Sequence, residues 1–280
     1  MTNNTGAAGD HLPPYRVRAR NTSATSDNKI HEDETAARYG FRGGLVPGVT
    51  VYAYMTVPLV ARFSDGWLER GSMQVKFHQP FYEGEEVIVR AEVDGDSDPI
   101  KVAVRAERED GTACATGLAT INDESDWLGK ARLEDYPIHA LPPFEARPIA
   151  SRGSVVKGAL LGTLIEKLDL KDTGPLRELD ERLPIYYGER AAAHPAALLG
   201  LANQVLMRNF ELGPWIHTSS DLINRSAARS GEDISVRGRI HDVFERKGHE
   251  FVTLDLLLAA NGNRVVQQVR HTAIYQIANR

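Results

Sequence analysis

The second half of this chain repeats the pattern of the first, and the repeat limits the possible folds more than any other feature. A shift of 148 residues superimposes four residues in the same order: Gly40, Arg42, Pro47 and Trp67 fall on Gly188, Arg190, Pro195 and Trp215. The apolar run 48–63 falls on a second apolar run, 196–210. Two copies of one unit in a single chain predict a pseudo-twofold arrangement of the kind found in a homodimer.

Each copy is expected to form one long helix followed by a meander of strands. Residues 48–63 are apolar on almost every side over about four turns, which predicts a buried helix. Residues 64–71 are expected to be a loop. The predicted strands are 15–19, 72–78, 86–93, 100–106 and 113–121 in the first copy, and 231–237, 251–258 and 265–277 in the second. Their apolar and polar residues alternate, as is typical of an antiparallel sheet covered on one face.

The chain therefore divides into four parts. Residues 1–14 are polar and are expected to be a flexible tail, and residues 15–123 form the first unit. Residues 124–153 contain four spaced prolines and no clear periodicity, which predicts a linker on the surface. Residues 154–280 form the second unit.

Composition excludes several classes of protein. With 280 residues, 42% of them hydrophobic, the chain can bury one large core or two ordinary ones. A net charge of −5 gives no field that favours nucleic acid or an anionic membrane. The single cysteine, Cys114, excludes an intrachain disulfide and a cysteine cluster for zinc. Because the sequence also shows no signal peptide and no membrane span, we expect a soluble cytoplasmic protein.

Segment 28–50 carries the candidate chemistry. It begins with polar groups around His31, passes a glycine-rich bend and ends in Pro47-Gly48, where the apolar helix starts. The first turn of a helix has free backbone N–H groups, and a glycine there lets a small group approach them. A titratable histidine and bare amide donors are the parts needed to hold and polarise a carbonyl group.

The same segment resembles a known signature. Its residues Asn28-Lys29-Ile30-His31-Glu32-Asp33, then Ala37, Gly40-Phe41 and Val46-Pro47-Gly48, are similar to the motif of the MaoC-like (R)-specific enoyl-CoA hydratases and dehydratases. In that family an Asp-x-Asn-Pro-x-His-x-Asp segment precedes an alanine, a Gly-Phe and a Val-His-Gly. The resemblance implies an α+β double hot-dog fold, in which two tandem units each wrap an antiparallel sheet around a long central helix.

The resemblance also implies roles for individual residues. His31 stands at the position of the catalytic histidine, Asn28 at that of a positioning asparagine, and Gly48 at that of the glycine whose amide holds the thioester oxygen. Lys29 and Pro47 depart from the motif. The catalytic aspartate is expected five residues before the histidine, where this chain has Ser26. Either a loop shorter by one residue lets Asp27 supply the carboxylate, or the catalytic dyad is broken.

The expected reaction is the hydration of 2-enoyl-CoA or the dehydration of 3-hydroxyacyl-CoA. Gly44, Val46, Pro47 and Tyr52 are expected to bind the substrate beside Gly48. No metal or redox cofactor is implied, since CoA belongs to the substrate, and neither nucleic acid nor membrane is expected as a partner. Two alternatives stay open: a thioesterase, which the same fold accommodates, and a non-catalytic protein that binds an acyl thioester or another small molecule. Association of two chains into a homodimer is also open.

Other residues have simpler structural interpretations. His31 could brace its loop, and Asp33 is expected to cap a short helix. The remaining candidates are interpreted as structural or exposed: His78, His194, His217, His241, His249 and His271. In the second copy, Leu179 replaces His31 and Ala196 replaces Gly48. We therefore expect one site per chain, built by the first unit, with the second unit forming part of its wall. No ionisable group is expected beside the second helix.

Overall fold

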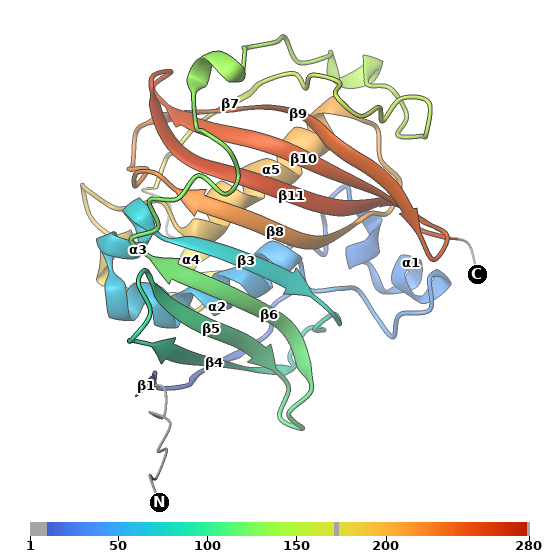
Figure 1. Ribbon diagram of the computed structural model, residues 1–280. Coiled ribbons are helices and arrows are strands. Elements are labelled where there is room, and N and C mark those ends of the chain that lie inside the picture. The colour runs from blue at the N-terminus through green and yellow to red at the C-terminus, as the bar shows by residue number, and fades with distance from the viewer. Residues whose placement is uncertain (1–9, 171–173, 279–280) are drawn as a thin grey trace, which may run out of the picture.

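A single antiparallel sheet runs through both halves of the computed structural model, which describes residues 10–170 and 174–278. Its strands follow the order β1-β4-β5-β6-β3-β8-β11-β10-β9-β7, and β2 pairs with β4. Two long helices, α2 (Gly48–Phe63) and α5 (Pro195–Asn209), lie on the same face of the sheet, one under each half (Figure 1). The predicted α+β architecture of two tandem helix-and-sheet units is confirmed.

The first unit follows the predicted order closely. Its elements are β1 (Asp10–His11), β2 (Tyr15–Arg18), the 3-10 turn η1 (Lys29–His31), α1 (Asp33–Arg38), α2, α3 (Asp65–Arg70), β3 (Ser72–Phe77), β4 (Glu86–Asp94), β5 (Ile100–Glu107) and β6 (Ala113–Ile121). Two predictions were wrong. The expected loop 64–71 contains α3, and the expected tail 1–14 contributes β1, which pairs with β4 through Asp10 and His11. The first nine residues of that tail lie outside the described part.

The second unit has the same order of main elements, with longer strands after its long helix and no counterpart of β1 or α3 among the described residues. Its elements are β7 (Leu164–Lys167), α4 (Gly174–Glu178), the 3-10 turn η4 (Pro184–Tyr186), α5, β8 (Ile216–Asn224), β9 (Asp233–Arg246), β10 (His249–Ala260) and β11 (Arg264–Gln276). Strands β7 and β8 were not predicted. The linker 124–153 lies against this unit, where the buried Tyr136 donates a hydrogen bond from its hydroxyl to the Asp255 carboxylate over 3.1 Å. No helix in the described parts of the chain is long and apolar enough to cross a membrane.

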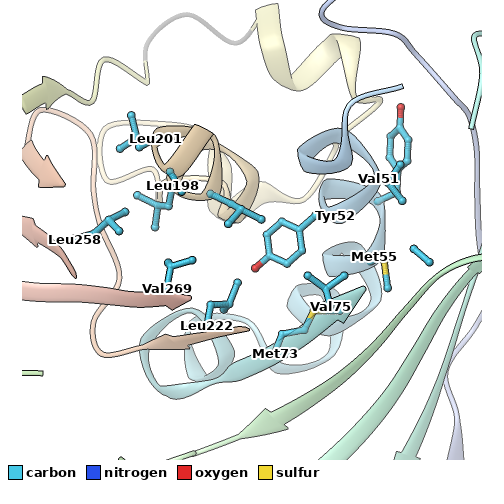
Figure 2. Close-up of a cluster of buried hydrophobic side chains, with 14 of the residues drawn as sticks. Val51, Tyr52, Met55, Met73, Val75, Leu198, Leu201, Leu222, Leu258 and Val269 are labelled. Carbon is cyan, nitrogen blue, oxygen red and sulfur yellow. The ribbon is translucent and has the colours of Figure 1, made fainter. Parts of the chain in front are cut away.

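The two units share one hydrophobic core. Strands β3 and β8 pair antiparallel, with Val75 opposite Ser220 and Met73 opposite Leu222, so the inner faces of both half-sheets are continuous. Tyr52 projects from α2 toward Leu222 and Val269 of the second unit (Figure 2). A fully buried aliphatic side chain stabilises a fold by roughly 1.5–3 kcal/mol. Because these contacts cross the repeat boundary, we expect the two units to stabilise each other.

Candidate active site

A cavity of about 260 Å³ lies at the N-terminus of α2. Most of its wall is apolar, and both units contribute to it. The first unit provides Val46, Pro47 and Phe77, whereas the second provides Ile216 and Ile274. The side chains that bring polar atoms to the wall are Asn28, His31, His78, Gln79, Asn203, His217 and Thr218. Among the described residues that line the cavity there is no carboxylate.

His31 presents one particular nitrogen to this cavity. Its Nδ1 lies 2.7 Å from the carbonyl oxygen of Leu45. A carbonyl oxygen only accepts hydrogen bonds, so Nδ1 carries the hydrogen and, in the neutral ring, Nε2 bears a lone pair. Burial lowers the pKa of His31 below its ordinary value of 6.5, and the bond to Leu45 opposes that shift. The imidazole is therefore neutral near pH 7.

Asn28 fixes the orientation of His31 and joins the two units. Its Oδ1 accepts hydrogen bonds from the backbone N–H groups of Trp215 at 3.2 Å and Ile30 at 3.4 Å. Its Nδ2 donates to the Trp215 carbonyl at 3.0 Å and lies 3.3 Å from His31 Nε2. Because the backbone of Trp215 determines which way the amide points, Asn28 meets His31 with a donor. That contact favours the tautomer in which Nε2 carries no hydrogen and its lone pair accepts from Asn28.

The first turn of α2 supplies amide donors beside the cavity. The N–H groups of Thr50 and Val51 bond to the carbonyl oxygen of Pro47 at 2.9 and 3.1 Å. The amides of Gly48 and Val49 precede them and have no acceptor within the helix. Both point out of the positive end of the helix dipole, where they can hold an anionic oxygen.

Gly48 is required by a close approach. A Cβ atom at this position would lie 2.9 Å from Nδ1 of His217 and 3.2 Å from Cε2 of Phe77. Contacts this short force neighbouring atoms to move. The glycine therefore lets a side chain from the second unit reach the start of α2.

Asp27 does not line this cavity, so of the two alternatives the structure favours the one in which the dyad with His31 is broken. The neighbouring Asn28 is buried and bonded to Trp215, whereas Asp27 is exposed. It lines a separate hollow of about 400 Å³ together with Arg147. Since Asn28 and Trp215 line both hollows, they form the wall between them.

Three other predicted residues have structural positions. Asp33 does not cap α1. It instead accepts a hydrogen bond from the Gly44 amide at 2.7 Å, because α1 begins at Asp33 itself. Gly44 lies outside the cavity and packs so closely that a Cβ would be 2.0 Å from the carbonyl oxygen of His31. Both residues therefore brace the His31 loop. Tyr52 is fully buried in the core between the units and does not line the cavity (Figure 2).

Two histidines interpreted as structural or exposed have more specific positions. His217 is 7% exposed and lines the cavity. His194 lies at the N-terminus of α5, where its Nδ1 accepts from the Ala196 amide at 3.1 Å and its Nε2 is 3.3 Å from Oε2 of Glu181. The expectation that the second helix has no ionisable neighbour was wrong. The aligned Leu179 gave no signal for this pair, because His194 and Glu181 do not stand at the position that aligns with His31.

Comparison with known proteins identifies the fold. No family model matches the sequence, and no curated protein matches it. Among solved structures, a MaoC-like dehydratase is 15% identical with a TM-score of 0.64, covering 96% of this chain and 98% of its own. A MaoC domain protein dehydratase of Chloroflexus aurantiacus is 12% identical, with a TM-score of 0.63 and 99% coverage of both chains. A conserved Mycobacterium tuberculosis protein with a double hot-dog fold is 14% identical, with a TM-score of 0.63 and 96% coverage of both.

The chain has the double hot-dog fold. At these identities the likeness establishes the arrangement of the backbone, and the chemistry has to be argued from the side chains. In this double hot-dog protein, the cavity lies where the first central helix begins, and residues of both repeats close around it. The described residues contain no group of three or more side chains that could hold a metal ion.

Proposed function

We propose that this protein catalyses the hydration of a 2-enoyl thioester, most directly a CoA thioester, and the reverse dehydration of the 3-hydroxyacyl form. One observation carries the proposal. His31 places Nε2, which carries no hydrogen, in the cavity that Gly48 at the start of α2 also lines, and the reacting water would replace the Asn28 amide as the donor to Nε2. A base and an oxyanion-binding group in one small cavity are the minimum for addition of water to an activated double bond.

The thioester carbonyl oxygen would lie at the first turn of α2. The amide of Gly48, which lines the cavity, would donate to this oxygen, which gains negative charge when water adds to C3 of the enoyl group. A single oxyanion-hole donor contributes about 10²–10³-fold to turnover in enzymes where it has been removed.

His31 would carry a proton from water to the substrate. Nε2 takes one proton as the water oxygen bonds to C3, and the electron pair of the double bond moves toward C2 and the thioester oxygen. The imidazolium then gives that proton to C2, which restores the neutral ring. Burial and the facing amide of Asn28 both disfavour the charged imidazole, so it gives up its proton readily.

The cavity favours a short acyl chain. Its volume of about 260 Å³ lies just below the range of roughly 300–1,000 Å³ that is common for small-molecule sites. Its apolar walls, including Phe77 and Ile274, suit a hydrocarbon chain rather than a charged group.

The test is to incubate the protein with crotonyl-CoA and with 3-hydroxybutyryl-CoA while following enoyl absorbance and free thiol together. We expect enoyl absorbance to change without release of thiol, and a His31→Gln variant to lose at least about 10²-fold in kcat. His78→Gln is the matched control, because His78 lines the same cavity but is exposed and bonded to the Thr116 hydroxyl. Thiol release would support the thioesterase, and binding without either change would support a non-catalytic protein.

A further inference from the structure

Three buried side chains form a hydrogen-bonded line that leads from the cavity into the core. His217 Nε2 lies 2.8 Å from the Ser220 hydroxyl, and that hydroxyl lies 3.0 Å from Nδ1 of His271. The two rings also contact each other, with centroids 4.2 Å apart. Ser220 is 1% exposed and His271 is fully buried. Burying three polar side chains costs free energy, so their presence in the core needs a physical reason.

A β-bulge places these side chains on one face of the sheet. Ser220 pairs directly with His271 across β8 and β11, whereas His217 pairs with Ala273. The register shifts between these pairs, which leaves Thr218 as the extra residue in β8. Residues three apart normally face opposite sides of a strand, but the bulge turns His217 to the inner side with Ser220. Thr218 fills the irregularity by donating from its hydroxyl to the Thr272 carbonyl at 3.1 Å.

The line ends in the cavity with a nitrogen that has no partner. Nδ1 of His217 is buried without a hydrogen-bond partner among the described residues. It points to the start of α2, as its 2.9 Å approach to a Cβ built on Gly48 indicates. From α5, Oδ1 of Asn203 is likewise buried and unpartnered within the described parts, and Asn203 lines the same cavity. Buried polar atoms normally have partners, so these two atoms indicate a place for a polar ligand.

The hydrogen bonds of Ser220 and the dipole of α2 together indicate which nitrogen of His217 can accept a hydrogen bond. The Ser220 hydroxyl has one hydrogen and stands between two ring nitrogens, so it donates to at most one histidine and accepts from at least one. The positive end of α2 next to Nδ1 of His217 favours a lone pair there. Nε2 of His217 then donates to Ser220, which donates to Nδ1 of His271. Burial keeps both rings neutral, because it lowers the pKa of His217 well below 6.5 and that of His271 to about 3.

We propose that His217 is a second catalytic residue, whose Nδ1 accepts a hydrogen bond from the reacting water or from the 3-hydroxyl group, and that Ser220 positions it by fixing its tautomer. This inference rests on the proposed hydration. The water donates one O–H to His31 and the other to His217, which aims an oxygen lone pair at C3. Only the first of these hydrogens is transferred. His217 therefore neither gains nor loses a proton, and the second hydrogen stays on the product hydroxyl.

The first test needs no substrate. In the full-length protein labelled with 15N-histidine, the Nδ1 resonance of His217 is expected in the range of an unprotonated nitrogen and that of Nε2 in the range of a protonated one. Ser220→Ala is expected to shift both resonances toward a mixture of tautomers, whereas Ser219→Ala, in the neighbouring residue, leaves them in place. A wild-type spectrum with hydrogen on Nδ1 of His217 would overturn the assignment.

The second test uses crotonyl-CoA hydration. Removing the acceptor in His217→Leu is expected to lower kcat by about 10²-fold, the size of effect that misplacing a reactant causes, with little change in KM. His217→Asn, which can place an acceptor near the position of Nδ1, is expected to recover part of kcat. Thermal unfolding of each variant checks that it folds. Unchanged kcat in a folded His217→Leu would refute the inference and leave the proposed function standing. A wild-type protein that hydrates nothing would refute both.

Discussion

Acid pH should unfold this protein partly through one buried side chain, His271. His271 belongs to β11, and its ring lies in the core beside Ser220 of β8 with no exposed surface, where burial lowers its pKa from 6.5 to about 3. The unfolded chain therefore binds a proton at His271 between these two values, whereas the folded chain does not. As a result, the stability that the neutral ring permits above pH 6.5 is lost progressively as the pH falls toward 3.

The size of this effect follows from the two pKa values. Each pH unit within the window is worth roughly 1.4 kcal/mol, so lowering the pH from 7.5 to 4.5 should remove about 2.7 kcal/mol through His271 alone. Domains of ordinary stability unfold with about 5–15 kcal/mol, so the loss is a substantial part of the total. His31 and His217 should act in the same direction, because burial lowers the pKa of both.

Urea unfolding at pH 7.5, 6.0, 5.0 and 4.5 measures the effect when wild type is compared with His271→Gln. The variant should lose roughly 2–3 kcal/mol less than wild type over this range, since an amide does not titrate. His241→Gln is the control, because His241 is exposed and should leave the pH dependence unchanged. Equal losses in wild type and His271→Gln would refute the assignment of this acid sensitivity to His271.

Three further predictions concern the wall of the cavity. Gly48→Ala should lower stability by about 1–3 kcal/mol and abolish hydration, because its Cβ meets His217 and Phe77. The control Gly66→Ala has open space around its Cβ and should do neither, as urea unfolding and the crotonyl-CoA assay can show. Asn28→Ala should cost about 1–3 kcal/mol in urea unfolding and reduce kcat, since it leaves the buried backbone of Trp215 unpaired; full activity would show that Asn28 does not orient His31. Asp27→Asn should keep kcat and change stability by no more than about 0.5 kcal/mol, and a large loss of turnover would restore Asp27 to the mechanism.

The fold could be predicted from the sequence because its strongest signals are local. The apolar run 48–63 became α2, and the β-rich run 113–121 became β6 without a change in its ends. Strand β8 was missed because its inner positions include Ser220, so apolar and polar residues do not alternate. The repeat itself contained the missing information, since the counterpart of the predicted strand 72–78 is segment 220–226.

The sequence could predict only those residues of the candidate site that come from one short segment. Asn28, His31, Val46, Pro47 and Gly48 are close in sequence, and all of them line the cavity. Asn28 is held by a bond to the distant Trp215 and Asp27 stays outside the cavity, and spacing within the motif reveals neither. His217 depends on a bulge and on pairing between β8 and β11, so no local pattern indicates it.

Solvent deuterium labelling tests most directly the claim that His31 carries a proton from water to the substrate. In D₂O, the wild-type protein should convert crotonyl-CoA into a 3-hydroxybutyryl thioester with one deuterium on C2, detectable by mass spectrometry after the hydroxyl deuterium has exchanged. His31→Gln should give no such product above the rate of a protein-free sample. Labelled product formed by His31→Gln at the wild-type rate would contradict the account.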